Sequence, residues 1–294
     1  MDVLKIRSLI LFPVIIGLIF TMAINGCVLL TGSETTHLEF LNHYNRKPVP
    51  DYPSYYTFLM YGNAILQIAA AILLAISLFN REYLVGKNAF FLKWGIFSGI
   101  LSVSIYGFMV RVISNHGAAA NLYFYAGFLY LLLWLVEQRK FNVRSDLFKK
   151  IKVLPIYFIL FYTMGFTGWQ KLFNSEVVMG GYVNIFKNSF LSKLPGGITP
   201  FIYFLGILEI SVPLLLVMSL FKKEFLLDKR TRFLDVSLFV SVTTFILLCF
   251  GLSVVMNYPG ATNLVFYALL TLGAYSYIYC NKLGHNLIDD SIEA

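Results

Sequence analysis

The sequence predicts an all-α integral membrane protein with eight transmembrane helices in two parallel four-helix bundle repeats and both termini on the cytoplasmic side. Three observations lead to this prediction: an apolar composition, eight segments of membrane-spanning length, and an internal repeat. Hydrophobic residues make up 58% of the 294 residues and charged residues only 13%. A soluble domain carries about 25% charged residues. The composition therefore indicates a chain embedded in a lipid bilayer.

Eight apolar segments approach or exceed the roughly 20 residues that a spanning helix needs. They are 9–31, 55–79, 90–113, 118–137, 153–173, 200–221, 234–256 and 261–280. Lysine and arginine gather before the first segment and after the second, fourth and sixth. Because positively charged loops stay in the cytoplasm, we predict a multi-pass protein of the bacterial inner (cytoplasmic) membrane. The formal charge of +8 then reflects membrane topology, and we predict no nucleic-acid partner.

The two long connections on the predicted outer side are 32–54 and 174–199. Each contains apolar residues at helical spacing ahead of a proline. This pattern predicts a short amphipathic helix on the outer face in each connection. We expect envelope protein partners to dock on these two loops.

Comparison of the chain with itself reveals a repeat at an offset of 142 positions, the distance from Thr21 to Thr163. Without a gap, the same offset aligns 73–84 with 215–226 and 115–126 with 257–268. We therefore predict a first four-helix repeat at 1–141 and a second at 142–294. Four helices separate equivalent points, so the halves share one orientation in the membrane.

Charges inside the apolar segments mark candidate functional residues. A charged side chain costs roughly 2.5–3.5 kcal/mol at the centre of a spanning helix on insertion scales. Lys171 and Glu209 have the uncharged repeat counterparts Leu29 and Gln67, and Arg111 aligns with Ser253. Lys171 either extends to the lipid headgroups or pairs. Glu209 is protonated, paired with Lys171 or Arg111, or exposed in a polar cavity.

Several uncharged residues complete the candidate site. Gln67 is included because it aligns with Glu209. Trp169 suits either an interfacial anchor or a ligand contact. Asn121 and Asn263 occur at equivalent positions beside short outer turns, where capping and turn formation compete with a ligand role. No nucleotide, hydrolase or metalloprotease motif is present, and the histidines match no metal-binding spacing, so we predict neither catalytic residues nor a metal site.

The stretch GWQKLF followed by FLGILEISVPLLLVMSLF resembles the DoxX-like family of small four-helix membrane proteins. Members show a glycine and a lysine-leucine pair at the end of one helix and a glycine-x-x-glutamate pattern in the next. By position, the resemblance points to Gly168, Lys171, Leu172 and Glu209. The first half departs from the pattern at Leu29 and Gln67. The family is associated with membrane redox systems, and quinone is the one cofactor that the resemblance implies.

Three functions follow as hypotheses. The first is a non-catalytic or accessory membrane subunit of a quinone-linked redox system of the cell envelope, which binds a lipophilic ligand or partner near the outer face. The alternative is a scaffold or assembly factor of an envelope complex. The third is a small-molecule or lipid transporter, which we rank last because paired helix breaks are missing from the two halves. Whether the chain is an enzyme is left open by the sequence.

Overall fold

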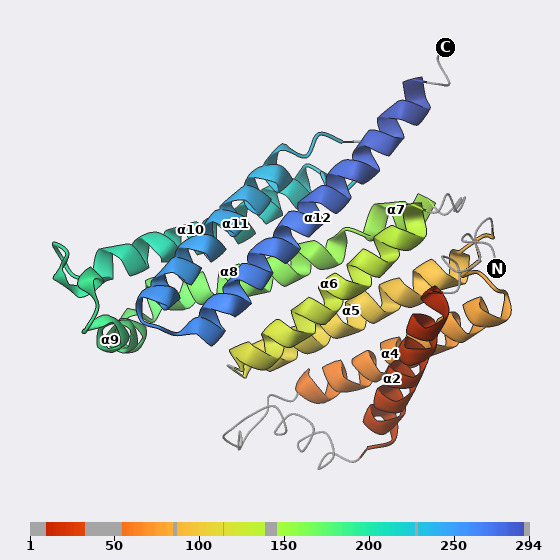
Figure 1. Ribbon diagram of the computed structural model, residues 1–294, viewed down its shortest axis with the longest axis horizontal. Helices are drawn as coiled ribbons and strands as arrows, with labels where there is room; N and C mark the ends of the chain where they lie inside the picture. The colour runs from red at the N-terminus through yellow and green to blue at the C-terminus, as the bar shows by residue number, and fades with distance from the viewer. Residues whose placement is uncertain are drawn as a thin grey trace. The chain divides into compact units, whose positions relative to one another are not determined.

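The computed structural model describes residues 10–32, 55–84, 87–113, 115–138, 146–226 and 229–290. Every regular element within these residues is helical, and eight of the described helices are long and apolar enough to cross a membrane (Figure 1). The prediction of an all-helical chain is confirmed for these residues, and the eight long apolar helices are compatible with a multi-pass membrane protein. The chain divides into two compact units, Met1–Phe148 and Lys149–Ala294, called unit 1 and unit 2 below.

The described residues of unit 1 form four long helices, and each packs on the next along the chain. They are α2 (Leu11–Thr31), α4 (Tyr55–Phe79), α5 (Phe90–Val112) and α6 (His116–Gln138), followed by the short α7 (Asp146–Ile151) at the boundary of the units. Glycines allow the close approach: a Cβ atom on Gly26 would lie 2.8 Å from the Ile68 side chain. Small residues serve in this way at helix interfaces in membranes. The amphipathic helix predicted within 32–54 lies outside the described residues.

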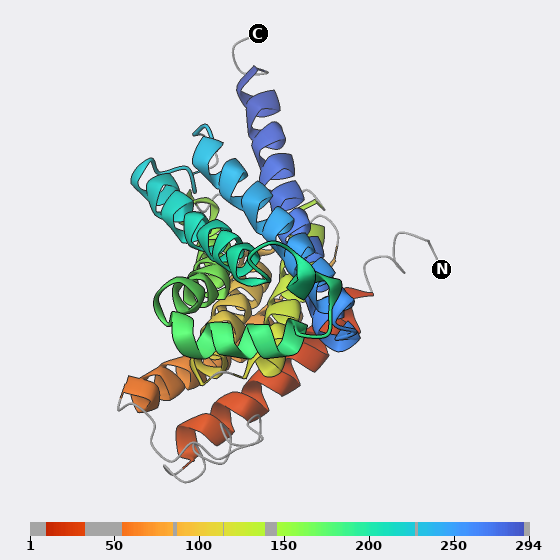
Figure 2. The same cartoon turned by 90° about the vertical axis from the view of Figure 1, so that its left-hand side faces the viewer.

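Within its described ranges, 149–226 and 229–290, unit 2 also has four long helices that pack in chain order. The elements are α8 (Leu154–Phe173), α9 (Ser175–Phe186), the 3-10 helix η1 (Phe190–Lys193), α10 (Thr199–Phe221), α11 (Arg232–Val254) and α12 (Tyr258–Asp290). The helix predicted within 174–199 is confirmed as α9. It crosses the ends of α8 and α10 instead of running alongside them (Figure 2). We call this end of unit 2 the α9 end.

The turn between α4 and α5 of unit 1 is held by a buried carboxylate. Oε2 of Glu82 accepts a hydrogen bond from the backbone N–H of Leu92, at 2.8 Å, in the first turn of α5. This interaction supplies a partner to an otherwise unbonded helix N–H group and places negative charge at the positive end of the helix dipole. Arg81 begins the turn in the left-handed region, with φ of 54°.

The turn between α10 and α11 of unit 2 has the same construction. Oε2 of Glu224 accepts a hydrogen bond from the backbone N–H of Leu234, at 2.8 Å. Lys223 has a φ of 57°. Ser219 adds a further hydrogen bond, donated from its hydroxyl to the Glu224 carboxylate. The two turns thus share a left-handed residue, a buried glutamate and a helix N–H acceptor at positions that correspond under the sequence offset.

Candidate functional site

Helices α8 and α10 approach each other closely because each helix has a glycine in the contact between them. A Cβ atom on Gly168 of α8 would lie 2.8 Å from the backbone nitrogen of Ile210 and 2.8 Å from the Cβ of Glu209. A Cβ atom on Gly206 of α10 would lie 3.2 Å from the Cβ of Lys171. No larger residue fits at Gly168 without displacing backbone. The glycines therefore bring the stems of Lys171 and Glu209 to neighbouring positions.

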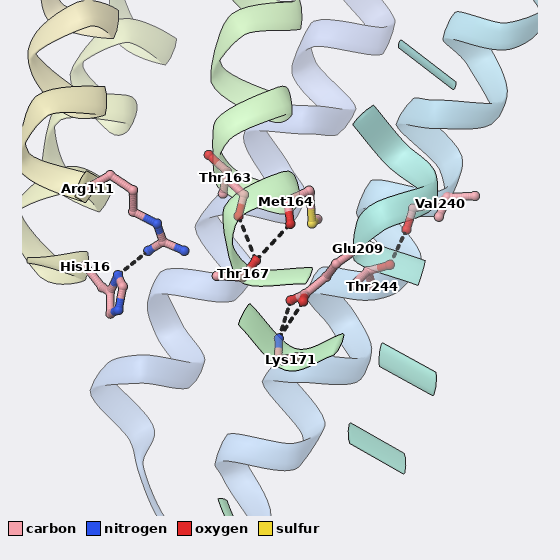
Figure 3. Close-up of polar contacts among 9 residues, drawn as sticks. All are labelled: Arg111, His116, Thr163, Met164, Thr167, Lys171, Glu209, Val240 and Thr244. Atoms are coloured by element: carbon pink, nitrogen blue, oxygen red, sulfur yellow. Dashed lines mark hydrogen bonds and ion pairs between the residues drawn. The ribbon is translucent and has the colours of Figure 1, made fainter. Parts of the chain in front are cut away.

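Lys171 and Glu209 form a buried ion pair in this contact (Figure 3). The Lys171 Nζ atom donates to both carboxylate oxygens, at 2.5 Å to Oε1 and 2.6 Å to Oε2. The side chains are only 3% and 1% exposed. Of the alternatives left open by the sequence, the structure selects mutual pairing: Lys171 does not extend away from the bundle, and Glu209 is not solvated.

Helix α9 covers the ion pair on one side. The Nζ atom of Lys171 lies 5.9 Å from the ring centroid of Tyr182, within the range of a cation–π contact. Met179 and Phe186 of α9 are buried in a hydrophobic cluster with Ile202 and Leu205 of α10. The helix is consequently anchored by apolar contacts on both sides of Tyr182. From its sequence context, Tyr182 suits an interfacial anchor or a ligand-stacking contact. Its contact with Lys171 could not be predicted, because it spans a turn that the sequence does not specify.

Arg111 belongs to unit 1, at the end of α5, and has a different partner. Its Nη1 atom lies 2.6 Å from Nδ1 of His116 at the start of α6. Because a guanidinium has no hydrogen-bond acceptor, Nδ1 of His116 must accept, and the imidazole is neutral with its proton on Nε2. Arg111 is 8% exposed. Glu209 is therefore not paired with Arg111. Lys171 pairs with Glu209 in unit 2, and Arg111 pairs with His116 in unit 1.

The remaining candidate residues are distributed over both units. Gln67 is buried on α4, whereas Asn121 on α6 is exposed and Asn263 on α12 is half-buried. Trp169 is 55% exposed and lies against Phe173, with 4.2 Å between ring centroids. Of all the candidate residues predicted from the sequence, the structure brings only Gly168, Lys171 and Glu209 into the contact between α8 and α10. Trp169 is also on α8, but its ring lies toward the outside of the unit.

Asn115 and Asn257, which correspond under the sequence offset, cap the helices that follow them. Oδ1 of Asn115 accepts from the backbone N–H of Ala118 at 3.1 Å. Oδ1 of Asn257 accepts from the N–H of Gly260 at 3.2 Å. Both side chains thereby satisfy a helix N–H group that has no partner within its own helix.

Among the described residues, no group of three or more His, Cys, Asp and Glu side chains is placed to hold a metal ion. No family model, curated protein or solved structure matches this chain.

Proposed function

We propose that this chain is an accessory, non-catalytic membrane subunit of a quinone-linked redox system in the bacterial cell envelope. In this proposal, unit 2 binds a partner protein or lipophilic ligand at the α9 end. The observation that carries the proposal is the closed Lys171–Glu209 pair beneath α9. The association with redox systems rests on the resemblance at Gly168, Lys171, Leu172 and Glu209.

The closed pair favours binding over catalysis. A general acid or base must reach the reacting atom of its substrate, but the Glu209 carboxylate has both oxygens on the Lys171 ammonium. Paired in this way, the two charges cancel, and the pair joins α8 to α10 below α9. Its role is then to position the surface above it.

That surface is apolar and exposed. Trp169 and Phe173 of α8 are 55% and 61% exposed, and Val183 and Ile185 of α9 are 48% and 55% exposed. Aromatic side chains provide large contact areas and are enriched at binding interfaces. A lipophilic ligand or an apolar face of a membrane partner is the chemistry that this surface, the α9 surface, matches.

A quinone does not fit at the ion pair itself. Its carbonyl oxygens require hydrogen-bond donors beside an apolar slot. Two N–H groups of Lys171 are already donated to Glu209, and the Tyr182 ring lies against the ammonium. We therefore place any lipophilic ligand on the α9 surface and derive no step through a quinone at the pair.

A scaffold or assembly factor is the second candidate, and the same closed pair favours it. A charge pair that is fully satisfied can serve only to hold α8 and α10 together, which leaves the α9 surface free for a protein partner. The two candidates differ in whether a small lipophilic molecule accompanies the chain.

We also propose that the two units arose by tandem duplication and share one orientation, with both termini in the cytoplasm. The matching turns support duplication: Glu82 bonds to Leu92 as Glu224 bonds to Leu234. The placement of basic loops supports the orientation. Within this arrangement the α9 end faces the outside of the inner membrane.

The test is purification of the tagged full chain from its native membranes in mild detergent. Quinones and copurifying proteins are quantified by mass spectrometry for wild type and for a Trp169→Ala/Phe173→Ala variant. The matched control is Met218→Ala/Phe221→Ala, which removes exposed apolar side chains, 45% and 79% exposed, from the opposite end of α10.

We expect the first variant to lose the bound partner or ligand by tenfold or more, and the control variant to retain it. Recovery of quinone would support the redox-linked subunit, and recovery of a stoichiometric protein without quinone would support the scaffold. Equal recovery from both variants would contradict a role of the α9 surface.

A further inference from the structure

Several uncharged polar side chains are buried on α4 and α5 of unit 1, among them Asn63, Gln67 and Ser102. Asn63 and Gln67 lie one helical turn apart on α4 and are 1% and 6% exposed, and Ser102 on α5 is 0% exposed. We call these three residues the polar seam. None of them belongs to the site at the α9 end, although Gln67 aligns with Glu209 under the sequence offset.

The register of α4 against α5 brings Gln67 and Ser102 to the same level of the helix pair, with Asn63 one turn away on α4. A Cβ atom on Gly95 would lie 3.1 Å from the backbone nitrogen of Leu74, so these two residues are level. Nearer the other end, the Tyr56 hydroxyl donates to the carbonyl oxygen of Met109 at 2.9 Å. Because the helices are antiparallel, moving two turns from the first contact reaches Gln67 on α4 and Ser102 on α5.

Helical periodicity also places the seam on the facing sides of the two helices. Gln67 and Asn63 precede Leu74 by seven and eleven residues, which keeps them on the side of α4 that meets Gly95. Ser102 follows Gly95 by seven residues and lies on the side of α5 that meets Leu74. The seam is therefore interior to unit 1.

The polar atoms of the seam are not satisfied by the protein. Within the part of the chain that the structure describes, Oδ1 and Nδ2 of Asn63, Oε1 of Gln67 and Oγ of Ser102 are buried without a hydrogen-bond partner. The nearby Ser104 shows the usual alternative, since its hydroxyl donates to the carbonyl of Ile100 at 2.6 Å. Buried polar side-chain atoms are otherwise nearly always bonded to protein or to ordered water.

We propose that the polar seam is a binding site for internal water. A water molecule both donates and accepts hydrogen bonds and needs two to four polar partners. Asn63 supplies an amide donor and an oxygen acceptor, Gln67 an acceptor, and Ser102 a hydroxyl that serves either way. The seam has no charge to select an ion. Unit 1 thus holds neutral, hydrated groups at the helix pair that corresponds to the α10–α11 pair of unit 2.

Hydroxyl-radical labelling of the full chain by brief X-ray irradiation tests this proposal, because radicals formed from bound water modify the side chains beside it. Tyr106 lies one turn from Ser102 on the same side of α5 and is 5% exposed. Tyr157 is the matched control: it is 4% exposed, and its hydroxyl is hydrogen-bonded to Ser219 at 2.7 Å.

We expect Tyr106 to be modified several-fold faster than Tyr157 in the wild-type chain. In an Asn63→Leu/Gln67→Met/Ser102→Ala variant, the rate at Tyr106 should fall to that of Tyr157. Equal rates at the two tyrosines in the wild type would overturn the proposal, and this arm requires no variant to fold.

A second measurement uses the sign of a stability change. If water bridges the polar seam, Asn63→Leu removes two hydrogen bonds to that water and lowers the Tm. The triple variant then recovers part of this loss, because no buried polar side chain of the seam is left without a partner. If the seam is dry, Asn63→Leu removes an unsatisfied amide and raises the Tm. A raised Tm would therefore overturn the proposal.

Discussion

Lys171 and Glu209 are joined through both carboxylate oxygens, at 2.5 and 2.6 Å, in the contact between α8 and α10. The two residues come from different helices and are 38 positions apart in the chain. Their pairing removes two isolated charges from an apolar environment. It also makes the stability of unit 2 depend on both residues together.

Lys171→Met should destabilise the protein by about 3–5 kcal/mol, because it leaves the Glu209 carboxylate buried without its cation. Lys171→Met combined with Glu209→Gln should recover much of this loss, since no charge remains. Unfolding of the purified protein in detergent, followed by circular dichroism, measures both effects. The contradicting result is additivity, in which the double variant loses as much free energy of unfolding as the single variants Lys171→Met and Glu209→Gln lose together.

Gly168→Ala should destabilise unit 2 by about 1–3 kcal/mol, the usual cost of forcing an extra group into a packed contact. The added methyl group would meet the Ile210 backbone at 2.8 Å, and backbone cannot rotate away. Gly273→Ala on α12 is the control, because no atom lies within 4 Å of its added Cβ. That control should stabilise the helix, by up to about 1 kcal/mol. Equal Tm values for the two variants would refute the close α8–α10 contact.

Tyr182→Leu should loosen α9, whereas Tyr182→Phe should not. The ring, and not the hydroxyl, faces the Lys171 ammonium, and a cation–π contact contributes roughly 0.5–2 kcal/mol. Hydrogen exchange of the α9 backbone amides, measured by mass spectrometry, reports the difference. Faster exchange in Tyr182→Phe would show that the hydroxyl carries the contact and would contradict this assignment.

Glu82→Gln and Glu224→Gln should each lower the stability by roughly 1 kcal/mol, because each weakens a charge-assisted hydrogen bond to a helix N–H group. The loss should be larger at Glu224, whose carboxylate also accepts from the Ser219 hydroxyl at 3.0 Å. Thermal unfolding compares the two variants directly. A loss at one glutamate and none at the other would contradict the equivalence of the two turns.

Much of the architecture could be predicted from composition and periodicity. Eight apolar segments become eight helices because an unbonded backbone is too costly in a bilayer, and a helix satisfies its own N–H and C=O groups. The short helix α9 was also predictable, since Val178, Tyr182 and Phe186 recur at helical spacing. The prediction of an equivalent helix in 32–54 remains untested by the described residues.

The partners of the charged residues were less predictable. Glu209 had three possible states from sequence alone, and Arg111 was one of its candidate partners. The structure assigns Lys171 to Glu209 and His116 to Arg111. The contact of Tyr182 with Lys171 was not predicted. Gly206 belongs to the glycine-x-x-glutamate pattern, and its lack of a side chain lets Lys171 approach α10.

By itself, the sequence determined which segments are helical, how long they are, and which of them carry charge, because hydropathy and backbone hydrogen bonding are properties of single segments. Only the tertiary structure decided that Lys171 and Glu209 form one neutral pair and that Tyr182 lies against it. Those contacts depend on the rotation and separation of α8, α9 and α10. Both are set by close glycine packing between helices, which hydropathy does not encode.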